Sequence, residues 1–586
     1  MARIAIVKRS DCNPKKCGQV CAKYCPVNRT GKECIVIDET AKIAEDLCTG
    51  CGICPKRCPF DAINIINLPQ QLKEKPVFRY AKNAFELFRL PTPQKGQVVG
   101  IVGANGIGKS TALEILSGLL KPNLGEFDRE LIAKEIIDSF KGTELQAYFT
   151  KLFGSSIKVS YKPQYIDLIP EKFKGKAIDL LSKAGTKKQI DNIAKDINIA
   201  GILNRKIDQL SGGELQKVAI SAAILKSADL YLFDEPASYL DVKERVRVAK
   251  VIRKLAEQGK NVIVVEHDLI ILDYLADLIH ILFGKRACYG VVSHPFSAKN
   301  GVNSYLDGYL KDENIRFRDE PIRFEHHIAG KQYDKVSFTK WPALKKKLGT
   351  FNLVIDPSEI HNKEIVGIVG ANAIGKTTFM KMIAGQLKPD SGEVKSKLKI
   401  SYKEQYLKPA KGVTVLQTLS SITKQVMSQK YKLEILRPLE LEHLLNHKVE
   451  ELSGGELQRV AIAVCLSRKA DFYLFDEPST YLDVEQRLQA ARAIQKFIKS
   501  NDTSALIIDH DLLFINFVSD RLMVFEGIPE KQGHAMNIQT VKKGMNHFLK
   551  ELDITLRKEP TTHRPRVNKT GSQKDKSQRK ADKYYE

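Results

Sequence analysis

The sequence lacks any long apolar run. A membrane-spanning helix needs roughly 18 to 20 apolar residues without charge, and the most apolar segments, residues 262–265 and 505–508, have only the length of strands. The first residues also lack the pattern of a secretory signal, because charged residues and a cysteine follow within a dozen positions. We therefore expect a soluble, cytoplasmic protein with no membrane partner.

Acidic residues are too few to balance the basic ones. The chain carries 93 Lys and Arg against 69 Asp and Glu, a formal net charge of +24. A polyanionic partner would account for this excess through phosphate neutralisation and counterion release, and nucleic acid is the obvious candidate. A scattered, solvated surface is the alternative. The 586 residues are too many for one hydrophobic core, so we expect three or more domains.

Cysteine is nearly absent beyond residue 58, since nine of the 11 cysteines lie before that point. Two runs stand out, Cys12-x4-Cys17-x3-Cys21-x3-Cys25-Pro26 and Cys48-x2-Cys51-x2-Cys54-x3-Cys58-Pro59. The second run has the spacing of bacterial ferredoxins, in which three thiolates hold one four-iron cluster and the fourth, before proline, reaches the neighbouring cluster. Soft thiolates suit iron and sulfide. We therefore expect two 4Fe–4S clusters, with the ligand sets Cys12, Cys17, Cys21 and Cys58 (cluster one) and Cys25, Cys48, Cys51 and Cys54 (cluster two).

Two other readings of these cysteines are a disulfide framework and a pair of zinc sites. Disulfides are disfavoured in a reducing cytosol. Structural zinc ligands do not usually come as two four-cysteine runs that each end in Cys-Pro. Three cysteines, Cys34, Cys288 and Cys465, fall outside both runs, and we expect them to be buried thiols rather than ligands.

From about residue 76 onward the chain repeats itself, and each half contains one G-x4-G-K-[ST] loop between a strand-like apolar run and a helical pattern. In such a loop successive backbone N–H groups converge on phosphates at a helix N-terminus, the lysine reaches the β- and γ-phosphates, and the hydroxyl meets Mg²⁺. The predicted ATP-binding residues are Gly103, Ala104, Asn105, Gly106, Ile107, Gly108, Lys109, Ser110 and Thr111, and then Gly370, Ala371, Asn372, Ala373, Ile374, Gly375, Lys376, Thr377 and Thr378. Ala373 stands where the first loop has Gly106, a change expected to tighten the second loop.

Further motifs recur in the same order in both halves: Leu-Ser-Gly-Gly-Glu-Leu-Gln, an apolar strand ending in Asp-Glu-Pro, a Tyr-Leu-Asp segment, and a histidine after another apolar strand. Here the sequence resembles the ATPase domains of ABC proteins, which assigns these segments as signature, Walker B, D-loop and H-switch. The resemblance implies that Asp234 and Asp476 hold the magnesium shell, together with Ser110, Thr377, Gln164 and Gln405. It makes Glu235 and Glu477 the residues that polarise the attacking water, and His267 and His510 the contacts to the γ-phosphate.

The same resemblance implies composite sites, because the two halves of an ABC ATPase face each other head to tail. The first site would combine the first phosphate loop with Ser453, Gly454 and Gly455, and the second site would combine the second loop with Ser211, Gly212 and Gly213. The residues that stack on adenine are not decided by the sequence. Phe85 and Phe351 lie 24 and 25 residues before Lys109 and Lys376, and Tyr80 is an alternative to Phe85. A role in the hydrophobic core is equally compatible with each of them.

Spacing between motifs locates an insertion in the first half. The interval from the first loop glycine to the signature serine is 108 residues in the first half and 83 in the second, and the excess lies before Gln164. Residues 130–140 and 144–153 have helical periodicity, and Thr143 could cap the second of these helices. We therefore expect a helix-loop-helix at about residues 125–155.

The whole pattern resembles the ABC-E family of ribosome-recycling ATPases, also called the RNase L inhibitor family. Supporting segments are residues 105–112, 142–150, 162–165 and 564–568. The resemblance implies a multidomain chain, with an N-terminal ferredoxin-like α+β domain that holds two iron–sulfur clusters and then two α/β P-loop ABC-type nucleotide-binding domains. The expected division is a ferredoxin-like domain at 1–75, a first ABC domain at 76–290, a hinge at 291–325, a second ABC domain at 326–530, a second hinge at 531–570 and a basic, disordered tail at 571–586.

The family resemblance also implies a function: ATP-driven closure of the two halves moves the cluster domain and splits a post-termination ribosome. The implied partners are the ribosome, chiefly its small subunit, and a class I release factor or Pelota-like factor. The chain would be a monomer with intramolecular pairing of its halves, and a compact chain of this kind suits an archaeon. Expected contacts to ribosomal phosphates are Tyr309, Arg316, Arg318, Arg564 and Arg566, with a purely structural role as the alternative. Two other functions stay open, an ATP-gated electron-transfer protein and the ATPase subunit of a transporter.

Overall fold

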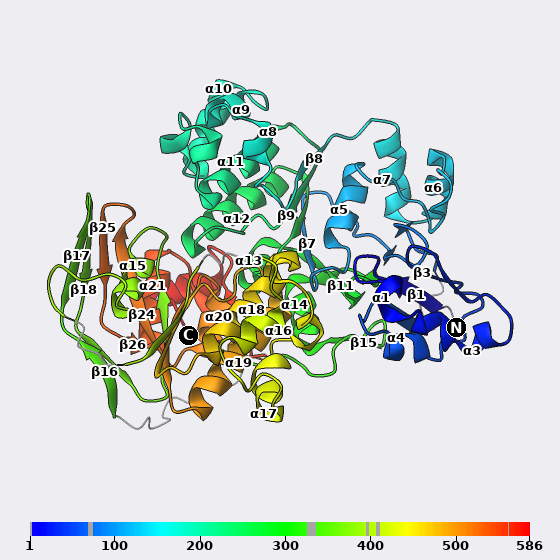
Figure 1. Ribbon diagram of the computed structural model, residues 1–586. Coiled ribbons are helices and arrows are strands. Elements are labelled where there is room, and N and C mark those ends of the chain that lie inside the picture. Colours follow the sequence, from blue (N-terminus) through cyan, green and yellow to red (C-terminus); the bar gives the residue numbers. More distant parts are fainter. Residues whose placement is uncertain (1–2, 68–73, 325–335, 394–397, 406–410, 561) are drawn as a thin grey trace. The chain divides into compact units, whose positions relative to one another are not determined.

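The computed structural model describes residues 3–67, 74–324, 336–393, 398–405, 411–560 and 562–586. Its contacts divide the chain into two units (Figure 1). The first comprises Met1–Pro236, Ile252–Glu266 and Ala276–Asp319, and the second comprises Ala237–Val251, His267–Leu275 and Glu320–Glu586. Two segments of the first ABC half therefore belong to the second unit. The expected boundary between residues 325 and 326 lies outside the described residues. No helix in the described part of the chain is long and apolar enough to cross a membrane.

The cysteine domain, residues 3–67, combines two small antiparallel pairs of strands with four short helices. Its elements are β1 (Arg3–Val7), α1 (Pro14–Cys17), α2 (Val20–Lys23), α3 (Pro26–Arg29), β2 (Ile35–Ile37), β3 (Ala41–Ile43), α4 (Ile53–Arg57) and β4 (Ile63–Asn67). β1 pairs with β4, and β2 pairs with β3. Pro14 and Pro26 begin their helices at a position where a missing N–H does no harm. The buried core contains cysteines beside aliphatic residues such as Ile43 and Ile63.

One asparagine of the first ABC half joins this domain to the rest of the first unit. The side chain of Asn83 donates to the backbone oxygens of Ala5 (2.8 Å) and Ile43 (3.0 Å), and its Oδ1 accepts from the Ile43 N–H at 2.8 Å. Asn83 is 3% exposed, so these bonds are shielded from water. An ion pair between Arg79 and Glu45, at 2.8 Å, lies nearby. The cysteine domain is thus attached to the first half by specific, buried polar contacts.

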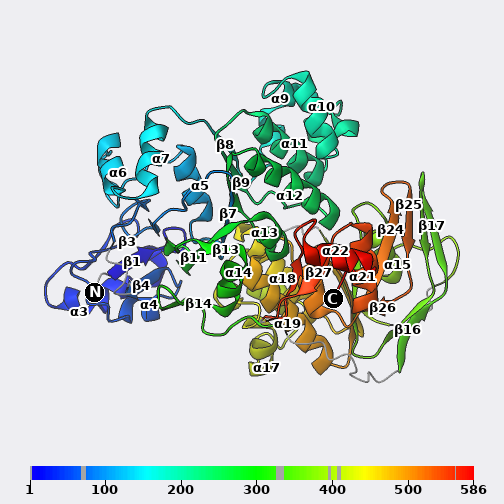
Figure 2. The same ribbon diagram turned by 180° about the vertical axis from the view of Figure 1, so that it is seen from behind.

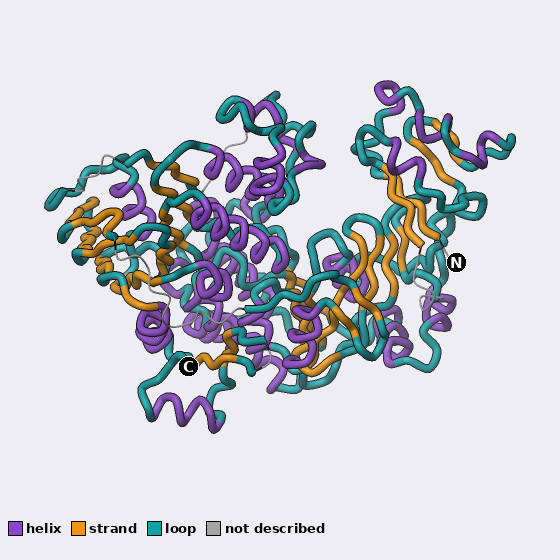
Figure 3. The backbone as a smooth tube through the Cα atoms, turned by 90° about the horizontal axis from the view of Figure 1, so that it is seen from below, coloured by secondary structure: helices purple, strands orange, loops and turns teal. Residues whose placement is uncertain are grey.

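The sheet of the first half is mainly parallel at its centre. Its strand order is β5-β6-β12-β11-β7-β10-β9-β8, and β13 pairs with β11. The strands are β5 (Phe78–Arg79), β6 (Glu86–Phe88), β7 (Val98–Val102), β8 (Val159–Lys162), β9 (Leu230–Asp234), β10 (Asn261–Val265), β11 (Leu278–Lys285), β12 (Tyr289–Val292) and β13 (Phe296–Ser297). β7 and β9 are buried along their whole length, as expected for parallel strands with both faces covered. Figure 3 shows the strands of the chain in orange and its helices in purple.

The helices of the first half include those that begin at the sequence motifs. They are α5 (Lys109–Ser117), α8 (Ile169–Lys172), α9 (Ala177–Ser182), α10 (Lys187–Asp196), α11 (Gly212–Leu225), α12 (Val242–Glu257), α13 (Leu269–Leu275) and α14 (Ala298–Asp307). A short antiparallel pair, β14 (Tyr309–Leu310) and β15 (Ile315–Arg316), follows. β7 and β9 end at the same edge of the sheet, so the phosphate loop after β7 meets the Walker B residues of β9 there.

Two helices, α6 (Ala133–Ser139) and α7 (Glu144–Phe153), occupy the segment where spacing places an insertion. They pack on each other through the stacked rings of Phe140 and Phe149, whose centroids are 4.9 Å apart. The Tyr148 hydroxyl donates to the Leu116 carbonyl at the end of α5. The first helix begins at Ala133 rather than at residue 130, because Glu135 at its third position bonds back to the Ile132 N–H at 3.0 Å and sets the start there.

The second half repeats the architecture inside the second unit. Its sheet has the order β17-β18-β25-β24-β20-β23-β22-β21, with β26 paired to β24. The strands of this sheet are β17 (Leu344–Leu348), β18 (Phe351–Ile355), β20 (Ile365–Val369), β21 (Ile400–Lys403), β22 (Phe472–Asp476), β23 (Ser504–Ile508), β24 (Arg521–Ile528), β25 (Gln532–Ala535) and β26 (Gln539–Thr540). A separate antiparallel pair consists of β16 (Ser337–Trp341) and β19 (Ser358–His361). The helices are α15 (Lys376–Ile383), α16 (Val415–Ser420), α17 (Gln429–Tyr431), α18 (Gly454–Ser467), α19 (Val484–Ser500), α20 (Leu512–Val518) and α21 (Val541–Glu551).

The C-terminal residues are ordered, and the expectation of a disordered tail at 571–586 is wrong. A helix, α22 (Gln573–Lys580), begins at the Ser572 cap and lies beside α21 (Figure 2). Its Asp575 accepts a hydrogen bond from Thr555 at 2.7 Å, and the Tyr585 hydroxyl donates to Asn516 at 2.5 Å. Tertiary contacts of a few side chains therefore order a segment whose composition is that of a solvated tail.

The second hinge is also more buried than the sequence indicates. β27 (Leu556–Lys558) pairs with β28 (Pro565–Val567), and Arg564 beside β28 has no exposed side-chain surface. Arg564 and Arg566 bind the Asp273 carboxylate of α13 at 2.9 and 2.8 Å. Arg564 is therefore not available to a phosphate, and the structural alternative applies to it.

In the first hinge, Arg318 donates to the backbone oxygens of Tyr305 and Leu306 at the end of α14. Arg316 is exposed and lies over the ring of Tyr309, 5.3 Å from its centroid. The predicted contact of Tyr309 and Arg316 with phosphate remains a prediction.

A buried histidine of β11 makes the stability of the first unit depend on pH. His280 is 2% exposed, its Nδ1 lies 2.7 Å from the Ser293 oxygen, and burial lowers its pKa from 6.5 to about 4. Because the folded state binds this proton less readily than the unfolded state, stability should fall as pH drops from about 6.5 toward 4, by up to ~1.4 kcal/mol per pH unit. Hydrogen exchange of β11 amides against pH measures this, and His280→Gln should flatten the profile. An unchanged slope in that variant would assign the acid sensitivity elsewhere.

Candidate functional site

In the first phosphate loop, the lysine side chain donates hydrogen bonds to carbonyl groups of the loop itself. Residues 103–108 connect β7 to α5, and Gly106 and Gly108 adopt φ of 74° and 93°, where glycine is favoured. The buried Lys109 ammonium donates to the carbonyls of Gly103 (3.0 Å) and Ala104 (2.8 Å). These carbonyls hold the Lys109 ammonium group beside the N–H groups of the loop, which can donate hydrogen bonds to phosphate oxygens.

The second loop has the same geometry. Lys376 donates to the Gly370 carbonyl at 2.9 Å and to the Ala371 carbonyl, and burial lowers its pKa to about 8. Ala373, at the place of Gly106, adopts φ of 57°, which costs about 1–2 kcal/mol for a residue with a Cβ. The expectation that this alanine tightens the loop stays a prediction. A nucleotide phosphate would compensate a lysine whose charged form is disfavoured by burial.

Each loop places a hydroxyl against a Walker B carboxylate. Ser110 Oγ donates to Asp234 Oδ2 at 2.7 Å, and Thr377 Oγ1 donates to Asp476 Oδ2 at 2.9 Å. Burial raises the pKa of Asp234 to about 6 and also raises that of Asp476, and the neighbouring glutamate adds to each shift. One hydroxyl and one carboxylate are the hard oxygen ligands that Mg²⁺ takes from protein beside phosphate oxygens. The pairs therefore fit a magnesium ion bound with nucleotide.

The glutamates predicted to be catalytic each accept a hydrogen bond from the predicted Q-loop glutamine. Gln164 Nε2 donates to Glu235 Oε1, and Gln405 Nε2 donates to Glu477 Oε1, both at 2.7 Å. Glu235 and Glu477 adopt φ of 47° and 50°, a left-handed conformation that is unfavourable away from glycine. The same conformation at both glutamates indicates that it serves the site.

Two further kinds of residue, which have no role in the site predicted from the sequence, hold these turns. Lys162 on β8 and Lys403 on β21 donate to the carbonyls of Asp234 (2.9 Å) and Asp476 (2.8 Å). Gln216 on α11 and Gln458 on α18 donate to the carbonyls of Glu235 (2.8 Å) and Glu477 (2.7 Å). Burial lowers the pKa of both lysines to about 8. The glutamine is the last residue of the signature motif in each half, so the repetition of that motif is the signal that could have found it.

The H-switch histidine of the second half lies next to its glutamate. His510 Nε2 is 3.5 Å from Glu477 Oε1. Burial alone would raise the pKa of Glu477, but the hydrogen bond and charge of His510, with Gln405 and Lys376, lower it to about 2. The Glu477 carboxylate is therefore held in its ionised form. His267 belongs to the second unit and Glu235 to the first.

The signature segments begin long helices and stay accessible. Ser211 and Ser453 cap α11 and α18, and in each capping box the following glutamate, Glu214 or Glu456, accepts from the serine N–H at 2.9 Å. Gly212, Gly213, Gly454 and Gly455 are the first residues of these helices, at the end that attracts anions. Each signature lies in the other unit from the phosphate loop that it is expected to serve.

One contact between the two ABC halves lies inside the second unit. The D-loop residue Asp241 of the first half accepts, through Oδ2, a hydrogen bond of 2.9 Å from the Asn372 N–H in the second phosphate loop. Its Oδ1 accepts from the Glu244 N–H at 3.0 Å at the start of α12. The D-loop of one half is thus fixed to the nucleotide loop of the other.

Aromatic residues expected beside adenine lie against the loops. A Cβ placed on Gly108 would be 2.8 Å from Phe85 Cζ, and one placed on Gly375 would be 3.1 Å from Phe351 Cζ. The Tyr80 hydroxyl is 3.1 Å from Thr111 Oγ1. Phe85 and Phe351 therefore take equivalent positions in the two halves, and either ring can also be counted with its core.

A cavity of about 300 Å³, open space included, lies in the cysteine domain. Its lining includes Cys25, Cys48, Cys51 and Cys54, the ligand set expected for cluster two. Burial raises the pKa of Cys21 in the other set, and the nearby thiols of Cys17, Cys12 and Cys58 raise it further. Each expected set therefore gathers in one place, although Cys25 and Cys58 come from opposite runs.

Cysteines outside the two sets are buried, as expected. Cys34 is 1% exposed and lies on the wall of the same cavity, where burial and then Cys25 and Cys48 raise its pKa to about 12. Cys288 and Cys465 are buried in the ABC halves. None of the 11 cysteines, all of which lie within the described ranges, forms a disulfide in the structure.

Comparison with known families matches both parts of the chain. The family model described as ABC transporter matches residues 92–238 and 357–480. A possible Fer4-like domain in RNase L inhibitor matches residues 2–33, and a 4Fe–4S binding domain matches residues 41–64. The fold and sites thus define an ATPase of the ABC class that carries a 4Fe–4S-binding domain.

Individual relatives cover most or all of the chain. Translation initiation factor RLI1 of Saccharomyces cerevisiae is 46% identical over 100% of this chain and 98% of its own length. A structure titled as a model of ribosome-bound archaeal Pelota and ABCE1 matches with a TM-score of 0.94, 49% identity, and 100% and 99% coverage. The archaeal ribosome recycling factor aABCE1, crystallised with the ribosomal stalk protein aP1, matches with a TM-score of 0.84, 49% identity, and 88% and 99% coverage. The chain therefore belongs to the ABC-E family, the family of the RNase L inhibitor.

Loss of both glutamate carboxylates should stop turnover without preventing nucleotide binding. Replacing Glu235 and Glu477 together by Gln keeps the size and the hydrogen bond but removes the proton acceptor, so steady-state ATP hydrolysis should fall by at least about 100-fold. Phosphate release measures this. The matched control is Glu257→Gln, an exposed glutamate of α12 whose loss should change nothing. Hydrolysis at the normal rate in the double variant would refute the assignment.

Proposed function

We propose that this chain is an ATP-dependent ribosome recycling factor, which splits post-termination ribosomes into subunits. The observation that carries the proposal is the duplicated ATP site, with the same hydroxyl–aspartate and glutamine–glutamate pairs in both halves, on a chain that begins with a 4Fe–4S-binding domain. The yeast relative is named a translation factor, and archaeal relatives are titled as a recycling factor and as ribosome-bound. ATP gating of electron transfer and transport across a membrane have no comparable support.

The chemistry at each site would be hydrolysis of the γ-phosphoryl group. Lys109 and Lys376 would leave their loop carbonyls and bind phosphate oxygens. Ser110 with Asp234, and Thr377 with Asp476, would hold Mg²⁺, which supplies positive charge beside the β- and γ-oxygens. Glu235 and Glu477 would accept the proton of the attacking water, with His510 keeping Glu477 oriented and ionised. Both left-handed turns are held by buried donors, so the carboxylates need no rearrangement at the moment of reaction.

Closure of the halves would convert ATP binding into movement. As in ABC ATPases generally, the signature helix N-termini of α11 and α18 would each meet the nucleotide held by the opposite loop. Two ATP molecules would then hold the halves together, and hydrolysis would release them. The Asn83 and Arg79 contacts attach the cysteine domain to the first half, so that domain would follow the motion of the first half.

The cysteine domain would hold two 4Fe–4S clusters, with Cys12, Cys17, Cys21 and Cys58 around one and Cys25, Cys48, Cys51 and Cys54 around the other. Thiolates supply the negative ligands that these clusters require. The clusters would act as structure, because each draws ligands from both cysteine runs and so joins segments about 30 residues apart in the chain. A domain made rigid by its clusters can transmit force, whereas a domain of this size without clusters would have too small a core to stay rigid.

The partners would be the small ribosomal subunit and a class I release factor or Pelota-like factor, met in the cytoplasm by a monomeric chain. The net charge of +24 suits binding to ribosomal RNA through phosphates. Arg316 and Tyr309 in the first hinge are accessible for such contacts.

Ribosome splitting is tested on sucrose gradients with purified ribosomes, the relevant release or Pelota-like factor, and a non-hydrolysable ATP analogue. Added protein should convert intact ribosomes into free subunits, with the protein on the small subunit. Lys109→Ala with Lys376→Ala, which removes the phosphate contacts, should leave ribosomes intact. Ribosomes that stay intact with the wild-type chain as well would count against recycling.

Because each proposed cluster takes ligands from both cysteine runs, the assignment predicts how the iron content changes in cysteine variants. Cys25→Ser should remove about half of the iron, and adding Cys51→Ser should remove little more, because both serve one cluster. Adding Cys17→Ser instead should remove nearly all the iron, because the two changes then affect different clusters. Cys34→Ser is the matched control and should keep full iron. Near-complete loss in the Cys25 and Cys51 pair would contradict the assignment.

A further inference from the structure

An arginine four residues after the D-loop aspartate joins two motifs of the first ABC half. Arg245 on α12 donates from Nε to the Leu240 carbonyl of the D-loop at 2.8 Å, and from Nη1 to Asp268 Oδ2 at 2.9 Å. Asp268 is the residue after the H-switch histidine, and its Oδ1 accepts from the Ile270 and Ile271 N–H groups at 3.0 and 3.1 Å. The guanidinium thus links the D-loop to the start of α13.

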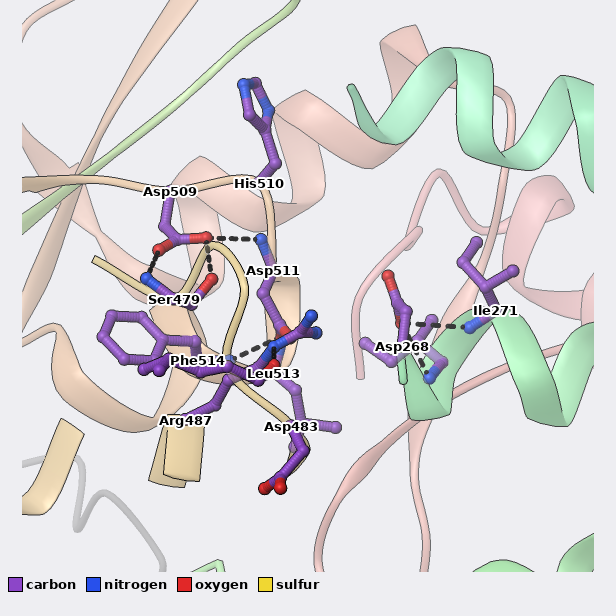
Figure 4. A network of polar contacts seen from close by, with 12 residues as sticks. Asp268, Ile271, Ser479, Asp483, Arg487, Asp509, His510, Asp511, Leu513 and Phe514 are labelled. Carbon is purple, nitrogen blue, oxygen red and sulfur yellow. Dashed lines mark hydrogen bonds and ion pairs between the residues drawn. The ribbon is translucent and has the colours of Figure 1, made fainter. Parts of the chain in front are cut away.

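The second half builds the same link from its own residues (Figure 4). Arg487 on α19 donates from Nε to the Leu482 carbonyl at 2.8 Å and from Nη1 to Asp511 Oδ2 at 2.7 Å. Asp511 Oδ1 accepts from the Leu513 and Phe514 N–H groups at 2.8 and 2.9 Å, as a cap of α20. Because both halves keep the same atom-by-atom arrangement, the link is a built feature of the fold.

The two links lie together in the second unit and form what we call the arginine–aspartate quartet, Arg245, Asp268, Arg487 and Asp511. All four side chains are largely buried, at 13% and 8% exposure in the first pair and 15% and 7% in the second. The pairs affect each other: burial and then the Asp511 charge raise the pKa of Asp268. Two carboxylates and two guanidiniums balance, so removing one partner of either pair leaves the other partner as an uncompensated buried charge.

Arg245 also reaches the second ATP site directly. Its Nη1 donates to the backbone oxygen of His510 at 3.5 Å, and His510 Nε2 is 3.5 Å from the catalytic Glu477. Asp241, one turn earlier on the same segment, binds the Asn372 N–H of the second phosphate loop. A segment of the first half therefore contacts the second site at its phosphate loop and at its H-switch.

We propose that Arg245 is a positioning residue of the second ATP site, which ties the H-switch of that site to the D-loop and H-switch of the first half. Its guanidinium sets the place of the His510 backbone, and hence of the imidazole that orients Glu477. A change at Asp268, next to the H-switch histidine of the first half, is carried through Arg245 to the second site. Such coupling between two sites is typically worth a 5- to 150-fold change.

The test isolates each site within the full-length protein. Glu235→Gln leaves only the second site able to hydrolyse ATP, and Glu477→Gln leaves only the first. Arg245→Met should lower single-turnover hydrolysis about tenfold in the Glu235→Gln background and much less in the Glu477→Gln background. Arg245→Lys keeps the charge but not the forked geometry and should restore part of the rate. Arg253→Met, farther along α12, is the matched control and should leave both backgrounds unchanged.

A second variant separates positioning from folding. Asp268→Asn breaks the first pair while Arg245 and its contact to His510 remain in the chain, and it too should slow the second site more than the first. Thermal unfolding is measured for every variant. Equal loss at both sites, or a loss that merely follows a lowered melting temperature, would overturn the proposal in favour of a stabilising ion pair. Because ATP turnover is measured without ribosomes, this outcome is separate from any failure of ribosome splitting.

Discussion

Buried charge at the carboxyl edge of each parallel sheet is the constraint on which the rest of the structure depends. In each half one lysine and one aspartate are buried at this edge, where loop carbonyls accept from the lysine and a loop hydroxyl donates to the aspartate. Burial moves the pKa of Lys376 down to about 8 and that of Asp234 up to about 6, so both charged forms are disfavoured by their surroundings. A magnesium-bound nucleotide carries the charges that these groups need, and its binding stabilises the arrangement around them.

From that edge, a short series of polar contacts leads to the other half. The Walker B turn fixes the glutamate, the glutamate meets His510, and the His510 carbonyl meets Arg245 of the first half. The D-loop aspartate Asp241 makes a parallel connection to the second phosphate loop. These links are direct and buried, so a change of a few tenths of an ångström at one is transmitted rather than absorbed. The quartet thus gives a physical route by which two chemically equivalent sites can differ in behaviour.

Much of this was predictable because the relevant chemistry is local in sequence. Phosphate loops, Walker B pairs and cysteine runs each place their key residues within a dozen positions, and comparison of the two halves located the insertion that α6 and α7 occupy. Long-range contacts could not be predicted in this way. Lys162 meets the Asp234 carbonyl across 72 positions, and Arg564 meets Asp273 across 291. The ordered tail has the same origin, because Tyr585 is held by Asn516 and not by its neighbours in the chain.

The most direct test of this account is the number of nucleotides held by one chain. The variant with Glu235 and Glu477 both replaced by Gln, incubated with magnesium and radiolabelled ATP and then freed of unbound ligand, should retain two ATP molecules per chain. Retention should be lost from one site at a time when Lys109 or Lys376 is changed to Ala in that background. A single retained nucleotide that depends on only one of these lysines would contradict the claim that both halves build a working ATP site.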